Sequence, residues 1–205
     1  MTASLFQKSP LASPGWLSRC MTLLFGLSLG GAVLAADVNP TPQVSLKTSM
    51  GEIVLELDAE KAPKTVANFM QYVKSGFYKG TVFHRVIDGF MIQGGGMDAK
   101  LVTKKTNKPI QNEANNGLQN VPYSIAMART GDPNSATSQF FINVAENQAL
   151  DYPGRDGFGY TVFGKVIAGQ DVVDKIKGVV VDDVKGQQNV PVVPIVITSA
   201  SVVKR

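Results

Sequence analysis

The stretch of sequence that decides the fold is TVFHRVIDGFMIQGGG, residues 81–96. It contains two short apolar runs, Val82–Ile87 and Phe90–Ile92, which are joined at Asp88–Gly89. An Asp-Gly pair between apolar runs is a turn signal, because glycine accepts a positive φ angle and aspartate tolerates one. The stretch therefore predicts two neighbouring strands connected by a tight turn.

Arg85 is a charged residue inside the first of these strands. Because side chains alternate between the two faces of a strand, we expect Phe83, Arg85 and Ile87 to share one face. His84 and Val86 then lie on the opposite face. An unpaired charge is costly to bury. Arg85 is therefore either an edge-strand arginine with its head in water, or a guanidinium held at the lip of an apolar groove.

Two other features of the stretch invite a functional interpretation. His84 is the only histidine of the chain, but it is predicted to lie opposite Arg85 and no partner nucleophile is in view, so a structural role is favoured. Gly94–Gly96 lacks the lysine, the Ser/Thr and the strand-loop-helix context of a nucleotide-binding loop. We expect these glycines to permit a close backbone approach at the end of a strand.

Several segments of the chain resemble the cyclophilin family of peptidyl-prolyl isomerases, and they occur in the family's order. The resemblance extends from about Val44 to Val203 and is greatest toward periplasmic cyclophilins of Gram-negative bacteria. It implies a closed eight-stranded antiparallel β-barrel capped by two α-helices, and an isomerase that needs no cofactor or metal. The segments are FHRVI (83–87), GFMIQGG (89–95), IAMAR (125–129), SQFFI (138–142) and VFGKV (162–166).

The resemblance also implies a role for individual residues. Arg85 is the expected donor toward the twisted X–Pro amide, and Gln93 and Gln139 are expected to orient it and the substrate carbonyl. Ala128 and Arg129 are expected to supply backbone and rim contacts to the residue before proline. Judged on the residues alone, the apolar members of the site are ordinary core. The expected wall of the proline pocket is Phe90, Met91, Phe141, Leu150 and Tyr160.

The chain departs from the best-known eukaryotic cyclophilins at three positions. Ala149 stands in place of a tryptophan, Tyr160 in place of a pocket histidine, and Arg129 in place of an asparagine. The tryptophan helps those proteins to bind cyclosporin, so weak cyclosporin binding is expected here. Tyr160 can still wall an apolar pocket and donate its hydroxyl. Because Arg85 and Gln93 are intact, isomerase activity should survive.

The first 36 residues are predicted to be a secretory signal peptide. Lys8 and Arg19 supply positive charge, and Met21–Leu34 is an apolar run of 14 residues with small residues after it at Ala35 and Ala36. The run is shorter than the ~20 residues that span a bilayer, so cleavage is favoured over an uncleaved anchor. We therefore expect a periplasmic protein that has no membrane contact after cleavage.

The rest of the chain is expected to form a tether, residues 37–43, and one isomerase domain, residues 44–205. The only cysteine, Cys20, lies in the predicted leader, so no disulfide is expected within the chain. The formal net charge of +4 falls to about +2 without Lys8 and Arg19, which is too mild to indicate nucleic-acid binding. No coiled-coil pattern or large apolar strip indicates more than a monomer.

Hydrophobic alternation and turn residues predict many strands and two helices, as expected for a closed barrel whose ends are covered by helices. A long polar excursion, residues 98–120, is expected to have little regular structure, and residues 186–190 are expected to be a polar connector. The expected helices are residues 62–78 and 169–177, with a short helical turn at 145–150. Outside the opening stretch, the expected strands are residues 44–48, 52–57, 123–128, 139–144, 161–167 and 194–203.

Two classes of function are compatible with such a groove. The first is an enzyme that accelerates X–Pro rotation in unfolded or flexible proline-containing chains. The second is a proline-peptide binding module or folding chaperone without essential catalysis. A purely structural barrel is disfavoured, because Arg85, Gln93, Gln139 and Phe141 occur together in the expected frame.

Overall fold

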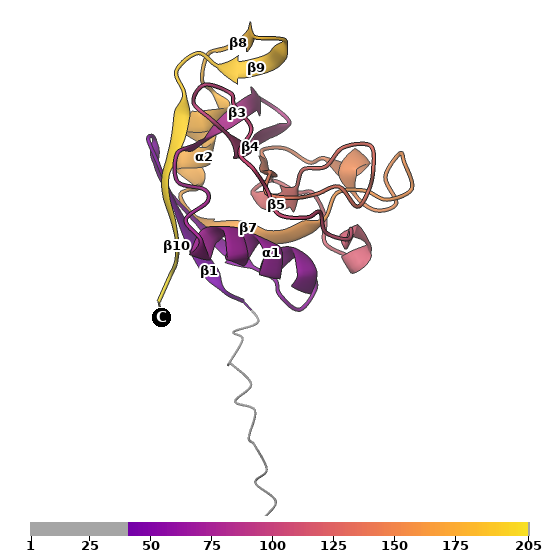
Figure 1. Cartoon of the computed structure of the whole chain (residues 1–205). Helices are drawn as coiled ribbons and strands as arrows, with labels where there is room; N and C mark the ends of the chain where they lie inside the picture. The colour runs from indigo at the N-terminus through magenta and orange to yellow at the C-terminus, as the bar shows by residue number, and fades with distance from the viewer. Residues whose placement is uncertain (1–40, 205) are drawn as a thin grey trace, which may run out of the picture. The chain divides into compact units, whose positions relative to one another are not determined.

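The computed structural model describes residues 41–204. The predicted leader and most of the predicted tether lie outside these residues. Eight antiparallel strands close into a barrel in the order β1-β10-β3-β4-β6-β5-β7-β2 (Figure 1), as the sequence predicted. The barrel strands are β1 (Gln43–Thr48), β2 (Gly51–Leu57), β3 (Thr81–Ile87), β4 (Met91–Asp98), β5 (Ser124–Met127), β6 (Phe140–Asn143), β7 (Val162–Ala168) and β10 (Ile195–Val202).

Two α-helices, α1 (Pro63–Lys74) and α2 (Gln170–Lys177), accompany the barrel, with short 3-10 turns at Ala114–Asn116 and Gln148–Leu150. The prediction that α1 continues to Tyr78 is wrong. The helix ends at Lys74 because the following turn places Gly76 in the left-handed region, with φ of 69°. No helix within residues 41–204 is long and apolar enough to cross a membrane.

Aromatic rings fill the centre of the main core. Phe69 of α1 lies 5.1 Å from Tyr78, 5.6 Å from Phe140 and 5.2 Å from Phe163, measured between ring centroids. The buried face of α2, including Val173, joins the same core cluster. Both helices therefore pack onto the hydrophobic core that the barrel encloses.

The segment after α2 forms a hairpin that the sequence did not predict. Strands β8 (Val181–Val184) and β9 (Gln187–Pro191) pair with each other outside the barrel, at the top of the view in Figure 1. The expected polar connector at residues 186–190 is therefore wrong. Lys185 and Gly186 adopt positive φ angles of 52° and 78°, which make the two-residue turn. Val190 is buried although the three residues before it, Gln187–Asn189, are polar.

The long excursion between β4 and β5 has little regular structure, as predicted, and it is fastened to the start of α1 by Glu113. One carboxylate oxygen accepts bonds from the Thr65 backbone N–H at 2.8 Å and from the Thr65 hydroxyl at 2.7 Å. The other accepts from the Lys64 N–H at 3.1 Å. Ala62, which precedes the helix, supplies no side-chain cap. Glu113 thus satisfies N–H groups that an α-helix leaves without partners.

Replacing Glu113 with alanine is expected to lower the free energy of unfolding by about 2 kcal/mol, since three hydrogen bonds to a carboxylate at the helix start are lost. Urea unfolding followed by far-UV circular dichroism measures the change. Glu146→Ala, at an exposed position, is the matched control. Equal stability of the two variants would show that Glu113 does not hold the helix start.

Candidate active site

A β-bulge in β3 places Arg85 on the face of the strand that points away from the main core. Phe83 pairs with Gly94 and Arg85 pairs with Gln93, so two steps along β3 match one step along β4. Phe83 accordingly lies in the main core, whereas Ile87 packs against a second apolar cluster. The prediction that Phe83 and Arg85 share a face is wrong, because the bulge interrupts the simple alternation.

The strand register then aligns a row of residues across five strands. Arg85 pairs with Gln93, Gln93 with Phe141, Phe141 with Ala126, and Ala126 with Val162. Directly opposed residues project to the same side of a sheet. The row therefore runs from a cation at one end to an apolar floor at the other.

The apolar floor is a compact cluster, separate from the main core, which we call the proline cluster. All five residues predicted to wall the pocket belong to it. Sequence reasoning missed Ala126 and Val162, although alternation from Ala128 and Tyr160 would have placed them on the same face. The buried members of the cluster are Met91, Ala126, Phe141 and Val162, and the half-buried members are Ile87, Phe90, Leu118, Ala128, Leu150 and Tyr160.

The Arg85 side chain is half-buried, and within residues 41–204 no hydrogen bond or ion pair engages it. Gln93 and Gln139 were expected to orient it, but they contact each other: Gln93 Nε2 donates to Gln139 Oε1 at 2.9 Å. The guanidinium N–H donors of Arg85 are therefore available to a substrate. A guanidinium is a planar cation that presents several N–H donors in a fixed fork.

The glycines after Gln93 make room for this amide pair. A Cβ atom at Gly96 would lie 2.3 Å from Cγ of Gln139, and one at Gly94 would lie 2.9 Å from the Val82 carbonyl oxygen. The predicted close approach at Gly94–Gly96 is confirmed. Next to the amide pair lies a hollow of about 150 Å³, lined by Gln93, Ala128, Arg129, Thr130, Ser135, Thr137 and Gln139.

A network of buried polar side chains connects segments that carry residues of the proline cluster. Asn143 Nδ2 donates to Asn120 Oδ1 at 3.1 Å and to Ser124 Oγ at 2.9 Å. Asn147 Nδ2 donates to Asn143 Oδ1 at 2.6 Å and to the Phe90 carbonyl at 2.7 Å. Asn120 Nδ2 donates to Asp151, the neighbour of Leu150, at 2.9 Å. The network thus links the Phe90 and Leu150 segments of the proline cluster, and sequence reasoning did not find it.

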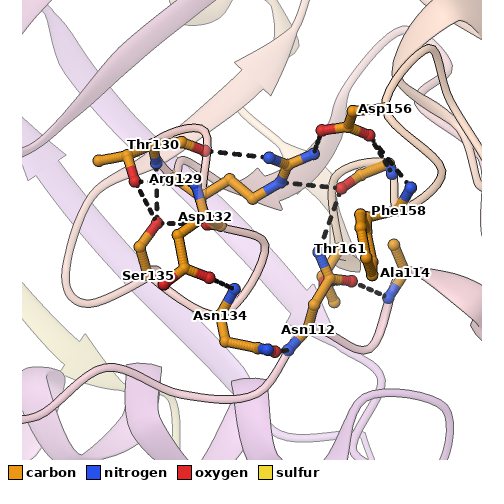
Figure 2. Close-up of polar contacts among 11 residues, drawn as sticks. Asn112, Ala114, Arg129, Thr130, Asp132, Asn134, Ser135, Asp156, Phe158 and Thr161 are labelled. Atoms are coloured by element: carbon orange, nitrogen blue, oxygen red, sulfur yellow. Dashed lines mark hydrogen bonds and ion pairs between the residues drawn. The ribbon is translucent and has the colours of Figure 1, made fainter.

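The Arg129 side chain is engaged inside the protein rather than at the rim, with only 3% of it exposed. Figure 2 shows its guanidinium between the Thr130 backbone and the loop that carries Asp156. Nε donates to the Gly159 carbonyl at 3.0 Å, Nη1 donates to the Thr130 carbonyl at 3.0 Å, and Nη2 forms an ion pair with Asp156. Only the backbone of Arg129 is therefore free for the substrate contacts expected of it.

His84 lies away from the row. It is 5% exposed and lines a different cavity of about 230 Å³ together with Val82 and Val190. Burial lowers the pKa of its imidazole, so the side chain is neutral at pH 7. A structural histidine, as the sequence favoured, fits this position.

Comparison with known proteins assigns the family. The family described as "Cyclophilin type peptidyl-prolyl cis-trans isomerase/CLD" matches residues 43–202. The chain belongs to this cyclophilin family. It is therefore an enzyme of the peptidyl-prolyl cis-trans isomerase class, as the sequence predicted.

Individual cyclophilins match most of the chain. Peptidyl-prolyl cis-trans isomerase A of Dickeya dadantii is 54% identical over 179 residues, which cover 87% of this chain and 94% of that protein. Isomerase B of Escherichia coli is 51% identical over 161 residues, or 78% of this chain and 98% of that protein. The crystal structure of a Cryptosporidium parvum cyclophilin has a TM-score of 0.67 at 27% identity, covering 80% of this chain and 99% of the other.

The positions that depart from the best-known eukaryotic cyclophilins have clear places in the structure. Ala149 is exposed in the 3-10 turn, directly before Leu150 of the proline cluster. The centroid of the Tyr160 ring lies 5.8 Å from that of Phe141 in an edge-on arrangement, which closes one side of the proline cluster.

Within residues 41–204, no group of three or more His, Cys, Asp or Glu side chains could hold a metal ion.

Proposed function

We propose that this isomerase accelerates X–Pro rotation in folding secreted proteins by stabilising the twisted amide with Arg85 above the proline cluster. The observation that supports this mechanism is the unpaired Arg85 guanidinium in register with the cluster. Unfolded or flexible proline-containing chains are the expected substrates.

Rotation about an X–Pro bond is slow because it breaks amide resonance, with a barrier of about 18–20 kcal/mol. No covalent bond has to form or break. A catalyst needs only to bind the twisted amide more tightly than either planar isomer. In the twisted amide the prolyl nitrogen becomes pyramidal and basic, so it accepts a hydrogen bond that the planar amide does not.

The residues of the row and of the proline cluster, with Gln139, share this task. Met91, Phe141 and their apolar neighbours bury the proline ring. Arg85 donates to the developing lone pair or to the carbonyl, and its charge is already in place before the bond rotates. The Gln93–Gln139 amide pair and the Ala128 backbone hold the residue before proline, so that one side of the bond stays fixed while the other side turns.

The test is a protease-coupled assay of cis-to-trans conversion in a short Ala-Pro peptide, using residues 37–205 and the Arg85→Ala variant. Acceleration by the parent and its loss in the variant support the proposal. An Arg85→Ala variant that retains full activity overturns the assigned mechanism. A parent that binds the peptide without accelerating rotation is a recognition module, the alternative function that uses the same groove.

For its location we propose the periplasm, on the basis of the predicted signal peptide in residues 1–36. Expression of the full chain in a Gram-negative host, followed by osmotic release and N-terminal sequencing, tests this. Release of a chain that begins near Ala36 supports the proposal. An uncleaved chain that stays with the cell pellet contradicts it.

Weak cyclosporin binding is the expected consequence of the alanine at position 149. An Ala149→Trp variant is expected to bind cyclosporin more tightly by about 2 kcal/mol, because a tryptophan at an interface contributes large apolar area. Isothermal titration of the parent and the variant measures the difference. Equal affinity would show that position 149 does not control drug binding in this chain.

A further inference from the structure

Tyr160 is the point at which the Arg129 contacts meet the proline cluster. The guanidinium carbon of Arg129 lies 4.3 Å from the centroid of the Tyr160 ring, within the range of a cation–π interaction. The ring meets Phe141 edge-on at an interplanar angle of 75°. The Tyr160 backbone N–H also donates to the Leu150 carbonyl at 2.8 Å. The orientation of this pocket wall is therefore set from one side by Arg129 and from the other by Phe141.

Asp156 completes the support of Arg129. One of its carboxylate oxygens pairs with Arg129, and the other accepts the backbone N–H groups of Phe158 at 3.1 Å and Gly159 at 3.3 Å (Figure 2). The hydrogen bond from Arg129 is the main reason that the pKa of Asp156 is lowered to about 2. The carboxylate is therefore charged throughout the physiological range of pH.

The loop that carries Asp156 is rich in glycine, and apart from Arg129 it is held near this point by Asn112, whose Nδ2 donates to the Gly159 carbonyl at 3.1 Å. Gly154, Gly157 and Gly159 all adopt positive φ angles, and glycine has more conformational freedom than any other residue. Arg129 is anchored at the end of β5, where the Ala128 N–H donates to the Gln139 carbonyl at 3.0 Å. A planar guanidinium with donors in a fixed fork can thus tie this loop to the barrel.

From these contacts we infer that Arg129 is a positioning residue of the isomerase, which acts through Tyr160. Its guanidinium, held by Asp156 and the Gly159 carbonyl, fixes the Tyr160 wall in the orientation that receives the proline ring. This inference rests on the proposed function of the groove, but it concerns the binding of proline rather than the rotation step. Arg85 lies at the far end of the row and keeps its role when Arg129 is changed.

A double-mutant cycle tests the inference. Arg129→Ala is expected to raise KM for an Ala-Pro peptide about tenfold while kcat changes less than about twofold, because a loosened wall weakens binding before it affects rotation. In a Tyr160→Ala background, the same change at Arg129 is expected to alter KM less than about twofold. A tenfold effect in both backgrounds, or no effect in either, overturns the inference.

The control variants separate positioning from simple unfolding. Arg155→Ala changes the neighbouring exposed arginine of the same loop and is expected to leave KM unchanged. Arg129→Lys keeps the charge but not the fork, and it is expected to restore less than half of the lost affinity. If Arg129→Ala does not fold, Asp156→Asn takes its place in the cycle. It is expected to raise KM by less than Arg129→Ala does, and again to have almost no effect in the Tyr160→Ala background.

The cycle remains informative if the parent proves inactive as an isomerase. Dissociation constants for the same peptide, measured by NMR titration, then replace KM. Coupling between Arg129 and Tyr160 in peptide binding would support the positioning role even though the proposed catalysis had failed. Absence of coupling in an active parent would overturn the positioning role alone.

Discussion

Replacing Arg85 with alanine is expected to lower kcat/KM for an Ala-Pro peptide by about 100- to 1,000-fold, the range seen when one preorganised donor is removed from an active site. The loss should appear mainly in kcat, because the donor acts on the twisted amide more than on the planar one. Stability should change by less than about 0.5 kcal/mol, since the side chain has no hydrogen bond or ion pair within residues 41–204.

Two further variants sharpen this result. Arg85→Lys keeps a positive charge on a flexible stem but loses the planar fork, so intermediate activity is expected. Arg155→Ala, a change of the same residue type at an exposed position, should retain full activity. NMR exchange spectroscopy of the peptide, which follows both isomers at equilibrium, gives the rates. An Arg85→Ala rate within threefold of the parent would remove Arg85 from the mechanism.

Replacing Asn143 with alanine is expected to lower the free energy of unfolding by about 3 kcal/mol, since buried polar groups that lose their partners cost about 1–3 kcal/mol. Asn143 is fully buried, and its side chain takes part in three hydrogen bonds. Without it, Asn120 Oδ1 loses its donor. Peptide affinity should fall as well, because the network holds Asp151 next to Leu150 and, through Asn147, the Phe90 carbonyl.

Urea unfolding of the Asn143→Ala variant, with peptide titration below the transition, measures both effects. Asn115→Ala is the matched control, because that asparagine is exposed. A stability loss below about 1 kcal/mol would mean that the neighbouring groups find other partners, and the network would then not be the support described here.

The barrel and its helices could be predicted because their signals are local. Alternation marks a strand such as β2, and apolar residues at helical spacing mark α1. The bulge between Phe83 and Arg85 could not be predicted in this way, since it depends on how β3 pairs with β4. The β8–β9 hairpin was missed for a related reason: its second strand is polar, and burial of Val190 is decided by tertiary contacts.

The candidate site, too, has residues that could be predicted from the sequence and contacts that could not. The resemblance supplied Arg85, Gln93 and Phe141, and the strand register brings these three into one row. Contacts between residues far apart in sequence gave no local signal. Arg129 was expected at the rim, whereas its partner Asp156, in a separate loop, draws it inside.

The β3 bulge affects where along a polypeptide an X–Pro bond can lie and still reach Arg85. It turns Arg85 away from the filled interior of the barrel, to the face of β3 on which Ile87 packs against the proline cluster. We expect a polypeptide bound on this outer face to continue in both directions, which a chamber inside the barrel would forbid. We therefore expect prolines in the middle of a long chain to be isomerised as readily as those near a terminus, without threading of a free end.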